Sequence, residues 1–198
     1  MRRSFLVALV GCVLLLAGCT ADGSAGTTEH SNVKVDTAQL RGMKQQAGVE
    51  PCTAGTSSSD LPQRTLPCLG GGPAVKLSTL RGPLVINLFA QWCGPCRSEL
   101  PYYQQLHEKT KGKVTVLGID YLDTRPDLAL RLVKETGVTY PLLADPDGVL
   151  RRDFGVRGLP GVVLVKPDGS VDVQLRVFRS YAELRGLVQK GLGVSVPS

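Results

Sequence analysis

Histidine is scarce in this chain, and the cysteine pattern of a zinc site is incomplete. Only two histidines occur among the 198 residues, His30 and His107, and they lie far apart without a His-x-His spacing. The motif Cys93-Gly94-Pro95-Cys96 occurs once, whereas a zinc site of this kind usually needs a second pair of ligands. We therefore expect no bound metal, and nothing in the sequence calls for another cofactor.

A hydrophobic run long enough to cross a bilayer is also missing from the start of the chain. The apolar stretch from Phe5 to Cys19 has 15 residues, whereas a membrane-spanning helix needs about 20. Positive charge at Arg2 and Arg3 precedes it, and small residues close it at Leu16-Ala17-Gly18-Cys19. This order is typical of an export signal, so we interpret residues 1–18 as a signal peptide.

The end of this signal resembles a bacterial lipobox, in which cleavage before the cysteine follows its lipidation. The resemblance implies that Cys19 becomes the acylated first residue and that Cys12 leaves with the signal. Residues 19–32 would then be a lipidated cysteine and a flexible tether, since Thr20 to Ser31 is rich in Gly, Ser and Thr. The expected location is the extracytoplasmic face of the cell membrane; plain secretion and an uncleaved anchor are the alternatives.

The charge pattern offers no sign of a nucleic-acid site. The formal net charge is +6, and the basic residues are scattered without aromatic residues between them. This indicates a solvated surface, so we expect no nucleic-acid partner and only mild attraction to anionic lipid. The run Gly70-Gly71-Gly72-Pro73 lacks the following helix and the Lys-Ser/Thr of a phosphate loop, and indicates a hairpin turn.

The strongest motif is Trp92-Cys93-Gly94-Pro95-Cys96, which follows the apolar run Leu84 to Ala90 and precedes a helical pattern. A strand that delivers two cysteines to the first turn of a helix suits thiol–disulfide exchange. Cys93 would lie at the helix N-terminus, where free N–H groups and the helix dipole stabilise a thiolate. Cys96, one turn further along, would resolve a mixed disulfide at Cys93. Half a zinc site and a structural disulfide are the alternative interpretations.

Two further cysteines, Cys52 and Cys68, are candidates for a structural disulfide in an exported chain. The segment between them carries Ser57-Ser58-Ser59 and little to bury, and a crosslink across a loop of this length contributes about 3 kcal/mol. Of the three possible pairings we favour Cys52 with Cys68 and Cys93 with Cys96, because Cys-x-x-Cys pairs close locally. The alternatives are electron relay from Cys52 or Cys68 to Cys93 and a four-cysteine metal site.

Beyond residue 74, the apolar pattern alternates between strands and helices. We expect strands at Leu84–Ala90, Lys113–Tyr121, Tyr140–Ala144, Gly161–Val165 and Val171–Val177, and helices at Cys96–Thr110, Pro126–Gly137, Gly148–Phe154 and Ser180–Gly191. Before them we expect a short helix capped by Asp36 and a hairpin of Thr65–Leu69 with Ala74–Leu77. This order predicts an α/β fold with a mixed central sheet flanked by helices.

The run from Asn87 to Pro101, which contains the cysteine motif, resembles the thioredoxin superfamily and, within it, the TlpA/ResA-like extracytoplasmic thioredoxins. Gly137 to Pro141 and Gly158 to Pro160 are similar to the same family, and the resemblance covers about Ala74 to Lys190. It implies a thioredoxin-like fold with an N-terminal hairpin and a central strand–helix insert. We expect, after the signal and tether, an N-terminal segment at 33–73, the thioredoxin-like domain at 74–191 and a tail at 192–198.

The resemblance also implies roles for individual residues. Pro160 matches a cis-proline that faces the two cysteines, and a cis bond would aim the Leu159 backbone at a substrate chain that pairs as an added strand. Glu99 matches an acidic residue that manages protons. It shares a helix face with Cys96, and burial would raise its pKa and let it take the Cys96 proton. An ordinary acidic residue near a helix N-terminus is the alternative.

Asn87 departs from cytosolic thioredoxins, which place an aspartate at this point of the strand. An amide cannot accept a proton, so we expect Asn87 to be a hydrogen-bonded strand residue. Trp92, the only tryptophan, would shield the site and contact substrate, together with Gly94 and Pro95 of the motif. Simple packing of the indole is the alternative.

Together these features predict a membrane-tethered thiol–disulfide oxidoreductase that acts on exported cysteine-containing proteins and exchanges electrons with an integral membrane partner. The Gly94-Pro95 pair resembles that of reducing thioredoxins, so we expect a reductase. By family analogy, its substrates would include the haem-binding thiols of apocytochrome c. The alternatives are an oxidase that introduces disulfides and a non-catalytic binding module on the same scaffold.

Overall fold

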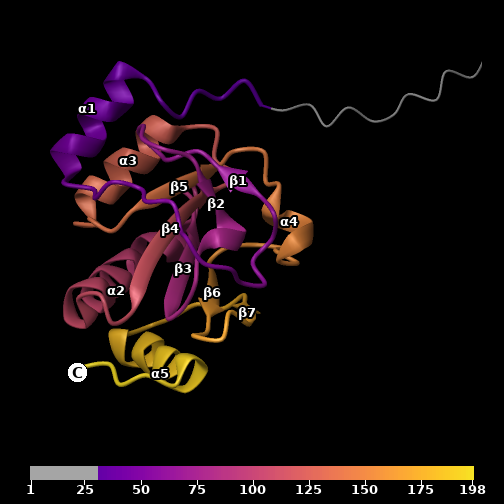
Figure 1. Ribbon diagram of the computed structural model, residues 1–198. Helices are drawn as coiled ribbons and strands as arrows, with labels where there is room; N and C mark the ends of the chain where they lie inside the picture. The colour runs from indigo at the N-terminus through magenta and orange to yellow at the C-terminus, as the bar shows by residue number, and fades with distance from the viewer. Residues whose placement is uncertain (1–30) are drawn as a thin grey trace, which may run out of the picture.

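The central element is a five-stranded sheet in the order β5-β4-β3-β6-β7 (Figure 1). The structure, a computed structural model, describes residues 31–198. The strands of this sheet are β3 (Leu84–Phe89), β4 (Thr115–Tyr121), β5 (Leu142–Asp145), β6 (Gly161–Val165) and β7 (Val171–Gln174). β3 runs parallel to β4, and β4 to β5, whereas β6 is antiparallel to both of its neighbours. The predicted mixed sheet is therefore confirmed.

β3 occupies the centre of the sheet because its side chains are buried on both faces. All six of its residues are buried, as expected of a strand that is covered on both sides. Val85 belongs to the apolar core on one face, and Ile86 and Leu88 belong to the core on the other. The last residue of β3, Phe89, leads into the cysteine motif, so the middle of the sheet positions the candidate site.

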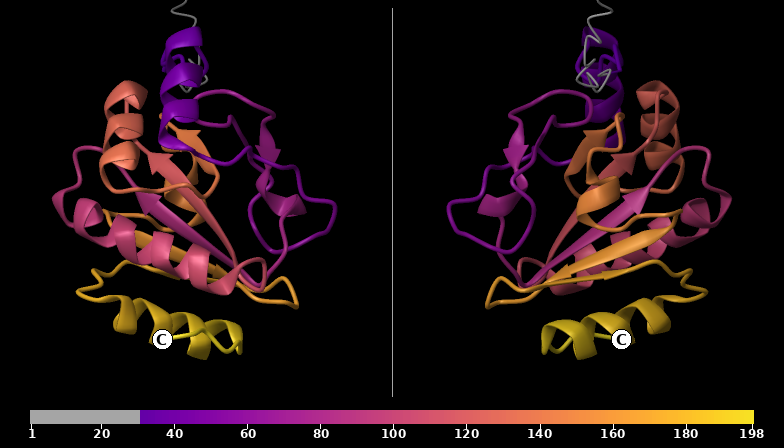
Figure 2. Two further views of the ribbon diagram at one scale, coloured as in Figure 1. Left: turned by 90° about the vertical axis from the view of Figure 1, so that its left-hand side faces the viewer. Right: turned by 90° about the vertical axis from the view of Figure 1, so that its right-hand side faces the viewer.

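Helices cover one face of the sheet, and the N-terminal segment covers much of the other (Figures 1 and 2). The first face carries α1 (Ala38–Ala47), α2 (Gly94–Thr110), α3 (Pro126–Glu135) and α5 (Tyr181–Leu192). The second face carries the hairpin of β1 (Thr65–Leu66) and β2 (Val75–Lys76), the 3-10 helix η1 (Leu77–Thr79) and the short helix α4 (Leu150–Asp153). Each face has its own apolar cluster, so two cores share one sheet.

A disulfide between Cys52 and Cys68 holds the N-terminal segment together. The two sulfurs are bonded, the Cα atoms lie 6.0 Å apart, and both residues are buried. Cys68 also forms a β-bridge with Leu143 of β5. Lys44 Nζ donates 2.9 Å hydrogen bonds to Cys68 Sγ and to the Gly71 carbonyl. The segment is thus attached to the edge of the central sheet at the disulfide.

The glycine run at residues 70–72 lies between β1 and β2, which pair in antiparallel fashion. All three glycines have positive φ, from 71° to 124°, a region that residues with a Cβ seldom adopt. At Gly71 an added Cβ would also lie 2.6 Å from Oδ1 of Asp36. The run is therefore the hairpin turn that the sequence predicted.

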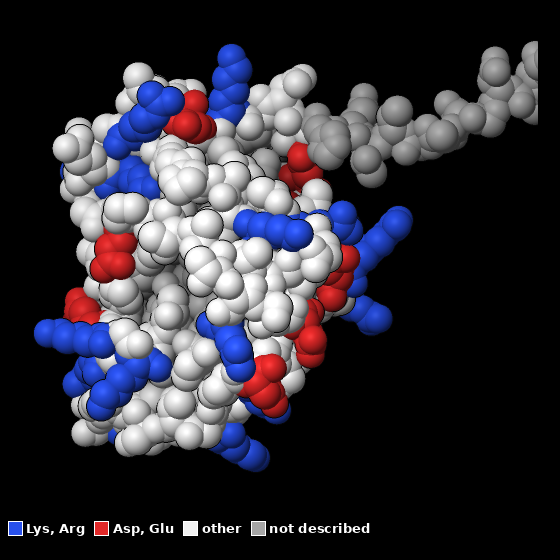
Figure 3. Space-filling model, viewed as in Figure 1, with Lys and Arg blue, Asp and Glu red and all other residues white. Residues whose placement is uncertain are grey.

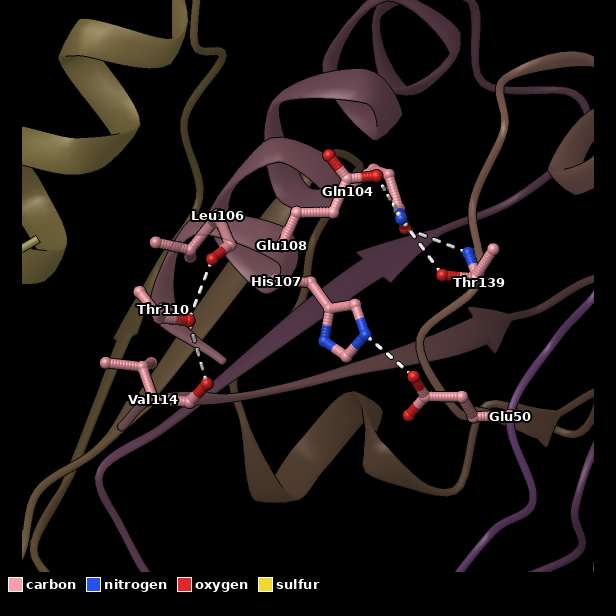
Figure 4. A network of polar contacts seen from close by, with 8 residues as sticks. All are labelled: Glu50, Gln104, Leu106, His107, Glu108, Thr110, Val114 and Thr139. Atoms are coloured by element: carbon pink, nitrogen blue, oxygen red, sulfur yellow. Dashed lines mark hydrogen bonds and ion pairs between the residues drawn. The ribbon is translucent and has the colours of Figure 1, made fainter. Parts of the chain in front are cut away.

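Polar contacts tie the second half of α2 to the chain that leads into β5 (Figure 4). Gln104 Oε1 accepts a 2.8 Å hydrogen bond from the Thr139 amide, and Gln104 Nε2 donates one of 2.9 Å to Thr139 Oγ1. One turn further along, His107 Nε2 lies 3.0 Å from Glu50 Oε1. The helix also continues through Pro101 without interruption. These contacts hold the second half of the helix whose N-terminus carries the motif cysteines.

Several element boundaries differ from the sequence prediction, most of them by one to three residues; the differences at α1 and β7 have identifiable causes. The N-cap of α1 is Thr37, whose hydroxyl accepts an amide hydrogen bond, whereas the predicted cap Asp36 pairs with Arg41 at 2.6 Å. β7 ends at Gln174 and not at Val177, because its pairing with β6 stops where Gln174 lies opposite Val162.

Charged side chains are spread over the molecule. In the face shown in Figure 3, Lys and Arg alternate with Asp, Glu and uncharged surface. Some opposite charges pair at the surface, such as Arg64 with Asp153 and Arg97 with Glu135, each at 2.7 Å. This distribution agrees with a solvated surface.

The N-terminal predictions lie outside the described residues. They comprise the signal peptide at 1–18 with Cys12, the lipidated Cys19 and nearly all of the tether at 19–32. Within residues 31–198, no helix combines the length and the apolar character needed to cross a membrane. The division into segments stays a prediction.

Candidate active site

The junction of β3 and α2 places Cys93 at the N-cap of the helix. Its φ and ψ of −87° and 101° are extended, and its Sγ accepts a 3.2 Å hydrogen bond from the Cys96 amide. Pro95 lies in the first turn, where its missing N–H removes no helical hydrogen bond. An anionic sulfur at this position would be stabilised by the free amides and by the positive end of the helix dipole.

Cys93 and Cys96 are bonded to each other, with their Cα atoms 5.3 Å apart. In this oxidised form 5% of Cys93 and 1% of Cys96 is exposed, whereas Gly94 and Pro95 between them are exposed. Cys93 is largely buried because its sulfur is bonded to Cys96 and accepts the hydrogen bond of the Cys96 amide. Cys93 is nevertheless the more accessible of the two.

The peptide bond between Leu159 and Pro160 is cis. Pro160 directly precedes β6, whose first residue, Gly161, pairs with Leu88 near the end of β3. The start of β6 and the end of β3 therefore lie side by side. Pro160 and the cysteine motif are thus at the same end of these two neighbouring strands. Leu159 is half-buried and packs against the cores of both faces.

A groove lies beside the cis proline. Its lining comes from the chain before β6 and the chain after β7, namely Gly158, Leu159, Pro160, Leu175, Arg176 and Val177. Leu175 and Val177 are 43% and 49% exposed. Exposed apolar side chains that gather beside a groove are typical of a contact site for another molecule.

Trp92 is held at its polar edge and open to solvent over much of its surface. The indole Nε1 donates a 3.2 Å hydrogen bond to the Leu122 carbonyl, and 54% of the residue is exposed. The indole is therefore not packed inside the core, which was the alternative interpretation. Its ring is available for contact with a partner beside Cys93.

Glu99 is buried on α2, one turn beyond Cys96. Oε1 accepts a 2.7 Å hydrogen bond from the Phe178 amide, whereas Oε2 has no hydrogen-bond partner. Burial raises the pKa of Glu99 from 4.5 to about 7, and the Phe178 amide and the charge of Arg176 oppose the rise. At neutral pH both forms of the carboxyl are therefore populated.

Asn87 is buried in β3 and has a specific partner there. Its Nδ2 donates a 3.2 Å hydrogen bond to the Tyr140 hydroxyl. Burial holds the pKa of Tyr140 above its ordinary value, so the phenol stays neutral. The structure thus places Asn87 as a satisfied strand residue, as a buried amide requires.

Sequence reasoning missed two acidic residues near the motif, Asp120 and Asp123. Asp120 lies in β4 and Asp123 in the loop after it, and both are buried. Asp123 Oδ2 accepts a 2.7 Å hydrogen bond from the amide of Gln91, which precedes Trp92. The available signal was an aspartate inside the otherwise apolar run Val114 to Tyr121, since a buried carboxyl needs a partner.

The two cysteine pairs belong to opposite faces of the central sheet. Cys93 and Cys96 are part of the core under the helices, and Cys52 and Cys68 are part of the core under the hairpin. The sheet between them argues against electron relay within one chain and against one metal ion bound by all four. In the part of the chain that the structure describes, no group of three or more His, Cys, Asp or Glu is arranged to hold a metal ion.

A mixed sheet, a Cys-x-x-Cys motif at a helix N-terminus and a cis proline at the same sheet edge define a thioredoxin-like protein. Among solved structures, MTB dsbF in its mixed oxidized and reduced forms matches with a TM-score of 0.61 and 29% identity, covering 68% of this chain and 98% of that one. The chain belongs to the AhpC/TSA family, which matches residues 58–174.

Two curated relatives carry names that describe thiol–disulfide chemistry. The thiol:disulfide interchange protein CycY of Rhizobium leguminosarum bv. viciae is 38% identical over 101 residues, which are 50% of this chain and 53% of CycY. The thiol-disulfide oxidoreductase ResA of Bacillus anthracis is 31% identical over 122 residues, which are 60% of this chain and 69% of ResA. The chain thus spans about half the length of CycY and about two thirds of ResA.

Proposed function

We propose that this protein is a membrane-tethered thiol–disulfide oxidoreductase that reduces disulfides of exported proteins through Cys93 and Cys96. The observation that carries the proposal is the Cys93 sulfur at the N-cap of α2, bonded to Cys96 and at the same sheet edge as the cis-Pro160. The family and the names of CycY and ResA support the reaction class.

The reduced form starts the reaction with a Cys93 thiolate. It attacks one sulfur of a substrate disulfide, forms a mixed disulfide and releases the other substrate sulfur as a thiolate. Cys96 then loses its proton and attacks the Cys93 sulfur, which breaks the mixed disulfide and frees the second substrate thiolate. Two electrons pass from the cysteine pair to the substrate, and the Cys93–Cys96 disulfide is left behind.

Glu99 is proposed to accept the Cys96 proton in the second step. It lies three residues beyond Cys96 on the helix, so the two side chains project from neighbouring positions. Its Oε2 is buried without a partner, and its pKa of about 7 matches the pH at which the reaction would run. We expect Glu99→Gln to slow resolution of the mixed disulfide and to flatten its dependence on pH near 7, as measured by stopped-flow kinetics.

The substrate is proposed to lie in an extended conformation between Trp92 and the groove beside Pro160. The Leu159 backbone would pair with it as an added strand, and the exposed Gly94 and Pro95 would contact it on the helix side. The exposed apolar surface on both sides of the cysteines suits a polypeptide that is not yet folded.

The expected signal at residues 1–18 and the acylated Cys19 underlie the proposed location. Two or more acyl chains would anchor the protein stably to the outer face of the cell membrane, whereas one would bind only marginally. There an integral membrane thiol–disulfide partner would reduce the Cys93–Cys96 pair again. We propose exported cysteine-containing proteins as substrates, apocytochrome c among them.

The reduction potential of the Cys93–Cys96 pair tests the proposed direction. A reductase requires a potential near that of thioredoxin, about −270 mV, whereas a value near about −120 mV would indicate an oxidase and end the reductase proposal. Cys93→Ser should abolish reduction of a model protein disulfide. A Cys93→Ser protein that still supports the cellular phenotype would instead indicate a non-catalytic binding module.

A further inference from the structure

Two carboxyl groups lie behind the loop that carries the cysteine motif. Asp120 is in β4, level with Phe89 at the end of β3; its side chain is buried, and Oδ1 has no hydrogen-bond partner. Asp123 is buried as well, and the two side chains are within hydrogen-bonding contact of each other. The exchange steps described above use neither residue.

Asp123 connects this pair to the motif. Its Oδ2 accepts the 2.7 Å hydrogen bond from the Gln91 amide, and its Oδ1 accepts one of 2.9 Å from the Arg125 amide. The adjacent Leu122 carbonyl accepts the 3.2 Å bond from the Trp92 indole. The two residues that precede the first motif cysteine are therefore both held by the loop after β4.

The backbone of this loop adopts a conformation that leucine seldom has. Leu122 has a φ of 50°, in the left-handed region where a Cβ carries a steric cost. Its side chain lies against Gly148, where an added Cβ would come within 2.5 Å of Leu122 Cδ2. Contacts with the rest of the protein must stabilise this loop conformation. Among them, the hydrogen bonds from Gln91 and Trp92 connect the loop to the motif.

Two buried carboxyls in contact disfavour a negative charge on both, so the pair favours a shared proton. Asp123 accepts two main-chain N–H bonds, whereas Oδ1 of Asp120 has no partner. Burial, together with the neighbouring charge of Asp123, raises the pKa of Asp120 well above its ordinary value. Asp120 is therefore the member of the pair that favours its protonated form.

The protonation of Asp120 depends on Asp123, because the other groups packed around Asp120 are apolar or have other partners. β3 and β5 present Phe89 and Ala144 at the level of Asp120, and the buried residues of α3 are apolar. The motif cysteines of α2 are joined in a disulfide, and Glu99, the buried acid of that helix, bonds to the Phe178 amide. Among the described residues, Asp123 is the one whose charge acts on Asp120.

We propose that Asp120 and Asp123 are positioning residues that share one proton and hold the motif loop in the geometry that activates Cys93. This inference rests on the proposed function, because it assigns the pair to exchange at Cys93. While the proton is present, Asp123 holds Gln91 and the loop holds Trp92, so the sulfur stays at the helix N-terminus. When Asp120 ionises, two adjacent buried negative charges repel each other and the loop loosens.

Two substitutions of Asp120 separate its hydrogen bond from its charge. Asp120→Asn keeps a donor toward Asp123 at every pH, whereas Asp120→Leu removes the donor. Both variants remove the Asp120 carboxyl, so they differ from each other chiefly in the hydrogen-bond donor. Glu99→Gln serves as a control that alters the other buried acid.

The fluorescence test uses the full-length oxidised protein, in which the motif cysteines do not titrate, with Trp92, its only tryptophan, as the reporter of the loop. Wild type should show a change in Trp92 fluorescence at alkaline pH that Asp120→Asn abolishes and Glu99→Gln retains. In Asp120→Leu the fluorescence should already be altered at neutral pH. Infrared spectroscopy should detect a protonated buried carboxyl in wild type that is lost in Asp120→Asn.

The reactivity of Cys93 provides the second readout. In Asp120→Leu, we expect the apparent pKa of the Cys93 thiol to rise by about one unit, so that alkylation at pH values below this pKa slows about tenfold, while Asp120→Asn stays near wild type. Equal fluorescence titrations and equal thiol pKa values in all three proteins would overturn the proposal. If Asp120→Leu does not fold, an alkaline transition that persists in Asp120→Asn overturns it.

If the proposed function itself is wrong, the alkylation experiment gives a different result. In that case the Cys93 thiol of wild type would be unreactive toward alkylation at neutral pH, whatever the state of Asp120. If Cys93 is reactive and its pKa is the same in wild type and in both Asp120 variants, the inference about Asp120 and Asp123 is wrong while the proposed function stands.

Discussion

Glu99 and Asp120 are both carboxyl groups in apolar surroundings, and their partners give them different proton chemistry. Glu99 has a main-chain donor at Phe178, which partly offsets the cost of burying its charge, so its pKa stays near 7. Asp120 contacts a second carboxyl, that of Asp123, and burial beside that charge raises the pKa of Asp120 well above its ordinary value. One residue is therefore suited to exchanging a proton near neutral pH, and the other to retaining it.

Replacing Glu99 with Gln should change how stability depends on pH. The folded state raises the pKa of Glu99 from 4.5 to about 7, so its stabilising contribution is complete below about pH 4.5 and is lost as the pH rises to about 7. Wild type should lose stability relative to Glu99→Gln across this window and run parallel to it above. Chemical denaturation at a series of pH values measures the difference. Parallel curves throughout would contradict the raised pKa.

At the scale of elements, the apolar runs that became β3, β4 and β6 were predictable because strands buried on both faces carry uninterrupted apolar sequence. The place of Cys93 at the N-cap followed from the strand–helix order around the motif. The Asp123 bond to Gln91 and the Trp92 bond to Leu122 were not predictable, since they join β3 and β4 loops that are distant in sequence. Local patterns do not encode such tertiary contacts.

The Cys52–Cys68 disulfide should contribute stability without taking part in exchange. Its partners are 16 residues apart in sequence, and closing a loop of that size is worth about 3 kcal/mol. Replacing both residues with Ala should lower the free energy of unfolding by about that amount, measured in urea, and leave alkylation of reduced Cys93 unchanged. A loss of Cys93 reactivity in the folded variant would show that the two pairs are coupled.

The contact between α2 and the chain before β5 should matter for stability. Gln104→Ala would leave the Thr139 amide and hydroxyl without their partner, at a cost of about 1–3 kcal/mol. The neighbouring surface variant Lys111→Ala is the control, since Lys111 is exposed at the end of the helix. Thermal unfolding measures the stability of the Gln104→Ala and Lys111→Ala variants relative to wild type. Equal melting temperatures would mean that the Gln104 bonds add nothing.

At the scale of the whole molecule, the central sheet separates the Cys52–Cys68 disulfide from the Cys93–Cys96 pair. The face under the hairpin holds a buried disulfide, and the face under the helices carries the motif at the sheet edge beside exposed apolar surface. This arrangement lets the N-terminal segment remain crosslinked while the Cys93–Cys96 pair is oxidised and reduced. The expected tether at residues 19–32 would add the freedom to meet partners at a membrane surface.

The tether gives a prediction for the full chain in cells. Cys19→Ser should prevent acylation and move the protein from the membrane fraction to the soluble extracytoplasmic fraction, because the acyl chains would be its anchor. Fractionation followed by immunoblotting measures the distribution, with Cys12→Ser as the matched control that should leave it unchanged. Membrane retention of the Cys19→Ser protein would argue against lipidation at this residue.

The most direct test of the central proposal is to trap the exchange reaction with Cys96→Ala in cells. Without the resolving sulfur, Cys93 should accumulate as mixed disulfides with exported cysteine-containing proteins, which mass spectrometry identifies after acid quenching. The Cys93→Ala/Cys96→Ala double variant should trap nothing. Recovery of Cys96→Ala only as free protein, with Cys93 accessible to alkylation, would contradict thiol–disulfide exchange at this site.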